Sequence, residues 1–185
     1  LAEWMANEGH SPLYYPRIWK RRFDSSVQVS GNGMAHIYLS GAARSETART
    51  NRDRWKAGSI FEGDFTPAYG DLVQDLLARP EVGLVITRRS EHEIIVRSEQ
   101  GMSVISRLAT DDYRYEPECG DAFGWSGVKG DYSGDELLAL SWSTLYPDAV
   151  EQLSQLFRSP RAGDIILSAQ PGYDLRDKHE RPEHK

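Results

Sequence analysis

Hydrophobic positions recur with two different periods along the chain, which predicts a protein built from both helices and strands. Apolar residues follow helical spacing between Thr66-Pro67 and Arg79-Pro80, and again over residues 147–158. Each segment is predicted to be an amphipathic helix that packs one side against a core. The first apolar stripe consists of Tyr69, Leu72, Val73, Leu76 and Leu77, and the second of Ala149, Val150, Leu153, Leu156 and Phe157.

Shorter runs of aliphatic and β-branched residues predict a sheet. Residues 27–29 and 34–39 are two candidate strands, separated by a Gly-Asn-Gly turn that suits positive φ. Short connectors then join three further runs, which are predicted to pair as an antiparallel meander. The apolar run 164–169 follows the second helix and predicts a strand buried on both faces. The three meander runs are residues 82–87, 93–97 and 102–108.

Residues 110–135 are rich in Asp, Gly, Tyr and Trp and are predicted to be a long loop. Loops of this length in compact domains usually have a function. Aromatic faces stack on rings and carboxylates accept bonds from hydroxyls, so the loop with Trp125 is a candidate lining for a sugar or nucleotide pocket. The alternative is a solvated acidic loop held in place by its aromatic residues.

These elements together predict an α/β fold, or α+β for the chain in isolation, with an inserted antiparallel meander and two amphipathic helices. No internal repeat or linker divides the sequence, so residues 1–185 are expected to form a single domain. Residues 66–135 are a possible inserted cap-like subdomain.

The composition of the 185 residues, 39% hydrophobic and 27% charged, is typical of a soluble globular protein. No apolar run approaches the roughly 18 residues that span a membrane, so no membrane segment is expected. The single cysteine excludes an internal disulfide and makes the cytoplasm the default compartment.

Charge is unevenly distributed along the chain. Residues 1–60 contain nine Lys and Arg against five Asp and Glu, whereas residues 61–185 contain thirteen against twenty-three. The basic clusters at 17–22 and 44–56 can meet phosphate groups, but such clusters are more often simply solvated. No nucleic-acid partner is therefore expected.

General catalytic motifs are missing from the sequence: it contains no P-loop, Rossmann glycine pattern, paired-cysteine zinc site or GxSxG elbow. The candidate substrate-binding residues are Asn32 in the Gly-Asn-Gly turn, His36 in the following strand, and Trp125. His36 has two interpretations, a polar group at the edge of a pocket or a hydrogen-bonded strand histidine. No catalytic residue and no metal ligand is predicted.

Four stretches resemble a known family: SGNGMAHIYL (30–39), PEVGLVIT (80–87), YPDA (146–149), and RAGDIILSA (161–169) with PGYDLR (171–176). Together they are similar to the C-terminal part of type I phosphodiesterase/nucleotide pyrophosphatase-like proteins, which belong to the alkaline phosphatase superfamily. The resemblance touches most of the chain, and its motifs are structural rather than catalytic.

The resemblance implies part of an alkaline-phosphatase-like sheet in a hydrolase of small phosphate esters that uses two divalent metals, of the zinc or manganese type. In that family a Thr or Ser nucleophile and an Asp-His-Gly motif come earlier, and a Ser-His-Gly motif comes later. Neither motif occurs here, so the chain is expected to be an inactive fragment of a longer hydrolase. The alternative is a non-catalytic binding or structural domain whose aromatic and acidic loop recognises a sugar or nucleotide.

Overall fold

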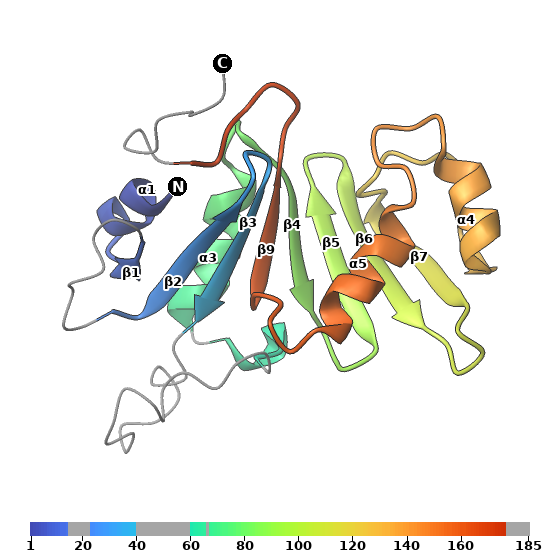
Figure 1. Cartoon of the computed structure of the whole chain (residues 1–185), viewed down its shortest axis with the longest axis horizontal. Coiled ribbons are helices and arrows are strands. Elements are labelled where there is room, and N and C mark those ends of the chain that lie inside the picture. Colours follow the sequence, from blue (N-terminus) through green and yellow to red (C-terminus); the bar gives the residue numbers. More distant parts are fainter. Residues whose placement is uncertain (15–22, 40–59, 66, 177–185) are drawn as a thin grey trace.

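The computed structural model describes residues 1–14, 23–39, 60–65 and 67–176 (Figure 1). In this part of the chain, nine strands form one mixed sheet and four α-helices pack on it. The helices are α1 (Ala2–Asn7), α3 (Pro67–Leu77), α4 (Gly134–Ser141) and α5 (Ala149–Arg158), with a 3-10 turn η2 (Glu62–Asp64). The strands are β1 (Pro12–Leu13), β2 (Ser25–Ser30), β3 (Met34–Leu39), β4 (Val82–Arg88), β5 (Glu93–Ser98), β6 (Gly101–Arg107), β7 (Tyr113–Gly120), β8 (Gly130–Tyr132) and β9 (Ile165–Ala169).

The last strand in sequence lies inside the sheet, whose order is β1-β2-β3-β9-β4-β5-β6-β7-β8 (Figure 1). β9 pairs antiparallel with both β3 and β4. Only the β1–β2 pair is parallel. The predicted α/β class is therefore confirmed, and so is the antiparallel meander, which corresponds to β4, β5 and β6.

Helices cover the two faces of the sheet in different places. Successive β9 residues point to opposite faces: Ile165 and Leu167 belong to a cluster with α3, whereas Ile166 belongs to a cluster with α5. All three side chains are fully buried, as predicted for this run. Figure 1 shows α3 behind β2, β3 and β9, and α5 in front of β5 and β6. We call these two sides the α3 face and the α5 face.

Both predicted amphipathic helices are confirmed. α3 buries Tyr69, Leu72, Val73 and Leu76 against the sheet, which is the predicted stripe apart from the half-buried Leu77. α5 buries Val150 and Leu153 in the other cluster. The Gly-Asn-Gly turn between β2 and β3 also forms as predicted, with positive φ at Gly31.

The predicted loop over residues 110–135 is wrong, because this segment contains β7, β8 and the start of α4. Tyr113 and Tyr115 point into the core between the polar Arg114 and Glu116, so a strand pattern of period two is present but largely polar. Pro117 lies where the β6–β7 register shifts, a position that tolerates the loss of a ladder hydrogen bond. The charged residues and the proline interrupt the apolar alternation, so the sequence pattern did not predict this strand.

The strands of residues 66–135 continue the same sheet as β9. A separate cap-like role for this segment stays a prediction. None of the helices in the described residues is long and apolar enough to cross a membrane.

Candidate functional site

His36 lies in β3 and has a structural partner. The Gly163 amide donates a hydrogen bond of 3.1 Å to its Nδ1, so this nitrogen carries no proton. Burial lowers the pKa of His36, which favours the same neutral form. A Cβ on Gly163 would lie 3.0 Å from the His36 Cβ, so the two backbones approach closely here. The geometry is that of a hydrogen-bonded strand histidine, and a contact between His36 and substrate stays a prediction.

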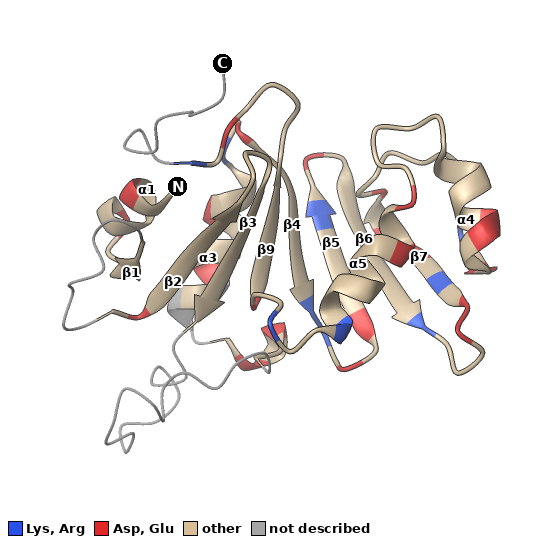
Figure 2. Cartoon of the chain, viewed as in Figure 1, with Lys and Arg blue, Asp and Glu red and all other residues tan. Residues whose placement is uncertain are grey.

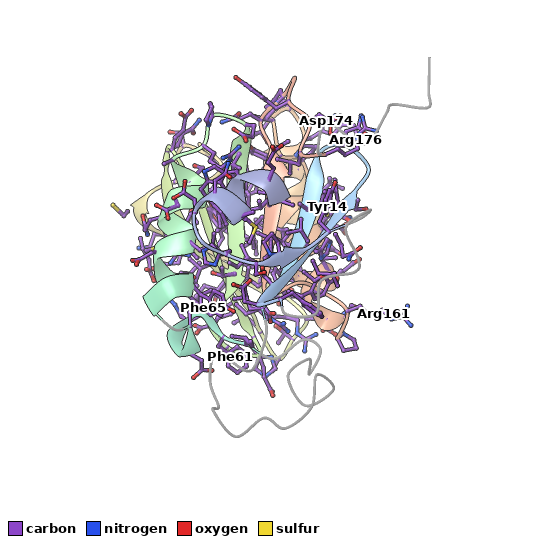
Figure 3. All side chains as sticks on the ribbon, turned by 90° about the vertical axis from the view of Figure 1, so that its left-hand side faces the viewer. Tyr14, Phe61, Phe65, Arg161, Asp174 and Arg176 are labelled. Atoms are coloured by element: carbon purple, nitrogen blue, oxygen red, sulfur yellow. The ribbon has the colours of Figure 1, made fainter. Side chains whose placement is uncertain are left out.

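Asn32 lies at the exposed tip of the β2–β3 hairpin. Its carbonyl accepts a hydrogen bond of 2.9 Å from the Leu175 amide, and the neighbouring Gly33 carbonyl accepts one of 2.7 Å from the Ala169 amide. The hairpin tip is therefore tied by its backbone to the segment after β9. Figure 3 shows Asp174 and Arg176 of that segment together at one end of the molecule, with Phe61 at the opposite end.

Trp125 belongs to an aromatic cluster in the core. It is 6% exposed, and its ring centroid lies 4.7 Å from that of Phe123 and 5.2 Å from that of Tyr115. The indole Nε1 donates to the Thr144 hydroxyl at 3.2 Å. One side of Trp125 lines a cavity of about 220 Å³, together with Tyr146. No hydrogen bond or ring contact within the described residues joins Trp125 to Asn32 or His36.

A larger cavity with a basic lining lies on the α5 face. Its volume is about 320 Å³. The α5 helix, the β4–β5 turn and the last residue of β6 surround it. We call it the arginine pocket; its lining residues are Phe61, Arg88, Ser90, Glu91, His92, Ile94, Arg107, Ser154, Phe157 and Arg158.

Arg88 is the buried cation of the arginine pocket, only 7% exposed. Its Nε and Nη2 atoms are buried and have no hydrogen-bond partner among the described residues. The nearest acid is Asp164, whose Oδ1 lies 4.0 Å from Nη2, too far for a hydrogen bond. Burial lowers the pKa of Arg88 and the Asp164 charge opposes this, and a guanidinium stays protonated in either case. The Arg88 guanidinium carbon lies 5.4 Å from the centre of the Phe157 ring, a cation–π distance.

Two further arginines reach the same pocket. Figure 2 shows basic segments at the lower ends of β4 and β6 and on α5. Arg158 pairs with the exposed Asp111 at 3.2 Å. Arg107 makes no ion pair that the structure records among the described residues. Among the described lining residues, three arginines accompany one carboxylate, Glu91, while Arg88 and Arg158 also lie near Asp164 and Asp111 outside the lining.

The hydroxyl groups of the pocket lining make local hydrogen bonds. The Ser154 hydroxyl donates to the Val150 carbonyl at 2.7 Å, and the Ser90 hydroxyl accepts from the His92 amide at 3.3 Å. Both hydroxyls of the lining are thus engaged locally, whereas the unpartnered donors are guanidinium N–H groups. Such groups match the oxygens of carboxylates and phosphates.

Sequence reasoning missed this pocket, although a signal for it exists. On the α5 face, β4 presents Leu84, Ile86 and then Arg88 at alternate positions. β6 likewise presents Ile105 and then Arg107 on that face. In both strands the apolar stripe ends on an arginine, which indicates that the buried face has a basic end. Only the order of the strands in the sheet brings Arg88 and Arg107 close together.

The two divalent metals that the resemblance implies find no site in the described residues. No group of three His, Cys, Asp or Glu side chains in that part of the chain can hold a metal ion. The basic clusters at 17–22 and 44–56 lie outside the described residues. No reaction step is therefore assigned to a metal here.

The chain matches no family model, no curated protein and no solved structure.

Proposed function

We propose that this chain is a non-catalytic part of a metal-dependent phosphoric ester hydrolase, of the phosphodiesterase/nucleotide pyrophosphatase type, acting on a small phosphate ester in the cytoplasm. One observation supports the proposal most: the stretches that carry the family resemblance, scattered over about 150 residues, form one continuous structural unit. A unit of this kind can act as one piece of a larger alkaline-phosphatase-like sheet.

Three of the resembling stretches supply neighbouring strands. Residues 30–39 end in β3, residues 80–87 contain most of β4, and residues 161–169 contain β9 between them. The paired residues run from Met34↔Ser168 to Ile37↔Ile165 on one side of β9 and from Val82↔Ala169 to Thr87↔Ile165 on the other. The three strands are therefore held together by two antiparallel ladders.

The YPDA stretch and residues 171–176, the second part of the fourth stretch, pack against this three-stranded unit. A bulge at Gly83 interrupts the β4–β9 ladder, and a Cβ on Gly83 would lie 3.1 Å from the Tyr146 Oη. Glycine at this position lets Tyr146 of the YPDA stretch approach the β9 end of the ladder. Residues 171–176 return to the β2–β3 tip through the Leu175 amide. All the resembling stretches thus meet around β9.

In the proposed hydrolase, the metals and the nucleophile come from sequence outside this chain. Two divalent ions supply activation of the nucleophile and stabilisation of the leaving oxygen. The described residues hold β3, β9 and β4 in register. In the proposed hydrolase, the metal ligands and the nucleophile from outside this chain would pack on this sheet.

The second candidate, a sugar- or nucleotide-binding module built on the aromatic loop, has less support. Trp125 and Phe123 face each other in the core, and the Tyr115 hydroxyl donates to Asp121 at 2.7 Å. These rings contact one another in the core, and Asp121 accepts through Oδ1, whereas its buried Oδ2 has no hydrogen-bond partner among the described residues. If the module interpretation were correct, Trp125→Ala would weaken the binding of a sugar or nucleotide without changing the fold.

The test compares the 185-residue chain with the whole gene product, using aryl phosphate mono- and diesters with zinc or manganese. We expect no turnover by the chain alone, and turnover by the whole protein that is lost on chelation. In the whole protein, Gly83→Val should lower activity by displacing Tyr146, whereas Gly63→Val, where a Cβ meets nothing within 4 Å, is the matched control. A metal-replete whole protein that hydrolyses neither ester would overturn the proposal.

A further inference from the structure

We propose that the arginine pocket is a binding site for a small organic oxyanion, whose charged head is held by Arg88 and whose apolar part rests against Phe157 and Phe61. This inference does not depend on the proposed hydrolase function, because it rests on donors, charge and volume in the described residues alone. No interpretation of the sequence assigned this site.

The first argument is the state of Arg88. A buried guanidinium is costly unless its donors are satisfied, and the donors at Nε and Nη2 are not. Asp164 does not satisfy them, because its Oδ1 lies 4.0 Å from Nη2, and its carboxylate accepts instead from the Leu39 amide at 2.8 Å and from the Ile60 amide at 3.3 Å. Arg88 therefore has partial charge compensation but unsatisfied donors among the described residues. Its side chain also lines the pocket, and a guanidinium matches the paired oxygens of an oxyanion.

The second argument is the charge at the pocket. Arg107 and Arg158 add two cations to that of Arg88, while Glu91 adds one anion. Arg158 is shared with Asp111, which lies outside the lining. Arg107, which has no recorded ion pair among the described residues, therefore adds an attraction for an anionic ligand to that of Arg88.

The third argument is the shape of the lining. At about 320 Å³, the cavity falls at the lower end of the range for small-molecule sites, which is about 300–1,000 Å³. A lone oxyanion leaves most of that space empty. Phe61, Ile94 and Phe157 line the remaining wall with apolar surface. Figure 3 places Phe61 at the lower end of the molecule. The ligand is therefore an oxyanion attached to a small apolar or aromatic body.

The binding test uses the 185-residue chain and three probes: phenyl phosphate, benzoate and inorganic phosphate, titrated calorimetrically at constant ionic strength. We expect phenyl phosphate or benzoate to bind more tightly than inorganic phosphate, and binding to weaken as salt rises. The preferred probe shows whether the head is a phosphate or a carboxylate. Saturable binding of neither organic probe at millimolar concentration would overturn the proposal.

Variants localise the binding to the pocket. Arg88→Gln should weaken binding by about tenfold or more, since a hydrogen bond to a charged group is lost. Arg107→Gln should weaken it less, and Arg88→Lys should retain part of it. Arg114→Gln, which removes the same charge at an exposed pair with Asp131, is the matched control and should bind like wild type. If Arg88→Gln does not fold, the affinities of Arg88→Lys and Arg107→Gln test the site instead. If both variants bind the preferred probe as tightly as wild type does, the site is excluded.

Discussion

Strands β1–β3 and strands β5–β8 bury opposite faces of the same sheet. The first group packs on α1 and α3 through a mainly aliphatic cluster, and the second packs on α4 and α5 through a cluster rich in aromatic rings. β9 and β4 lie between them and contribute alternate residues to both clusters. The protein thus has two half-cores that share a central pair of strands rather than one core beneath one layer of helices.

The face that each half leaves without a helix carries polar pairs, in two different ways, although Ile95 and Val104 are buried on that face of the second half. On the α5 face of β3, His36 and Tyr38 stack with ring centroids 6.2 Å apart. On the α3 face of the other half, charged residues pair across strands, as Arg89 does with Glu118 at 3.0 Å and Arg114 with Asp131 at 2.6 Å. A sheet can expose a face where its alternate positions are polar, so the helices need to cover only the apolar half of each face.

The largest expected effects come from neighbouring residues of β9. Ile165→Ala and Ile166→Ala each remove a fully buried side chain, and each should lower the free energy of unfolding by about 2–5 kcal/mol. Chemical denaturation measures this cost. Hydrogen exchange then tests the comparison: Ile165→Ala should expose α3 amides, and Ile166→Ala should expose α5 amides. Identical exchange patterns in the two variants would mean that the two half-cores are one cooperative unit.

Smaller losses of unfolding free energy are expected when two buried tyrosines lose their hydroxyl groups, and the two losses should differ. The Tyr115 hydroxyl contacts Asp121 at 2.7 Å and Ser103 at 2.9 Å, and burial raises the pKa of its phenol, so it stays a neutral donor. Tyr115→Phe leaves a carboxylate without this donor and should cost about 1–3 kcal/mol. Tyr69→Phe loses a bond to the Asp24 carbonyl and should cost about 0.5–1.5 kcal/mol. Urea denaturation of both variants measures the difference, and a larger loss for Tyr69→Phe would contradict it.

Removing an ion pair on the open face should matter less. Arg89→Gln breaks an exposed pair with Glu118 and should change the free energy of unfolding by about 0.2–1 kcal/mol. Urea denaturation at low and high salt is the measurement, because screening should shrink the difference. A salt-independent loss would mean that Arg89 stabilises the sheet through packing instead.

The smallest effect should appear only in mild acid. Burial places the pKa of folded His36 below the ordinary 6.5, so the unfolded chain binds the proton more readily. The His36 contribution is therefore complete above pH 6.5 and declines as the pH falls through that value toward the folded pKa. His36→Asn keeps an acceptor for the Gly163 amide and should lose less thermal stability between about pH 7 and 5. His92→Asn, in an exposed turn, is the control. If the melting temperature falls equally with pH in wild type, His36→Asn and His92→Asn, the expectation is refuted.

Prediction from the sequence succeeded where one local period dominates. The stripe from Tyr69 to Leu76 forms α3, and the runs at 82–87 and 93–97 form β4 and β5 within one residue of the predicted ends. It failed over 110–135, where Arg114, Glu116 and Pro117 interrupt the apolar alternation of β7. Of the candidate site residues, Trp125 was predicted to line a pocket in a loop. The structure places it in the aromatic cluster of the core, with one side on a cavity.

The sequence by itself determined α3, α5, the strands with a clear apolar pattern and the apolar side of each, because these properties depend on residues two to four positions apart. Only the tertiary structure decided that β9 lies between β3 and β4, and that Arg88, Arg107 and Arg158 meet at one cavity. Those neighbours are separated by 19 to 134 positions in the chain, and strand pairing depends on the whole set of contacts rather than on local pattern. The arginine pocket exists because strand order brings two apolar stripes to a common basic end beneath α5.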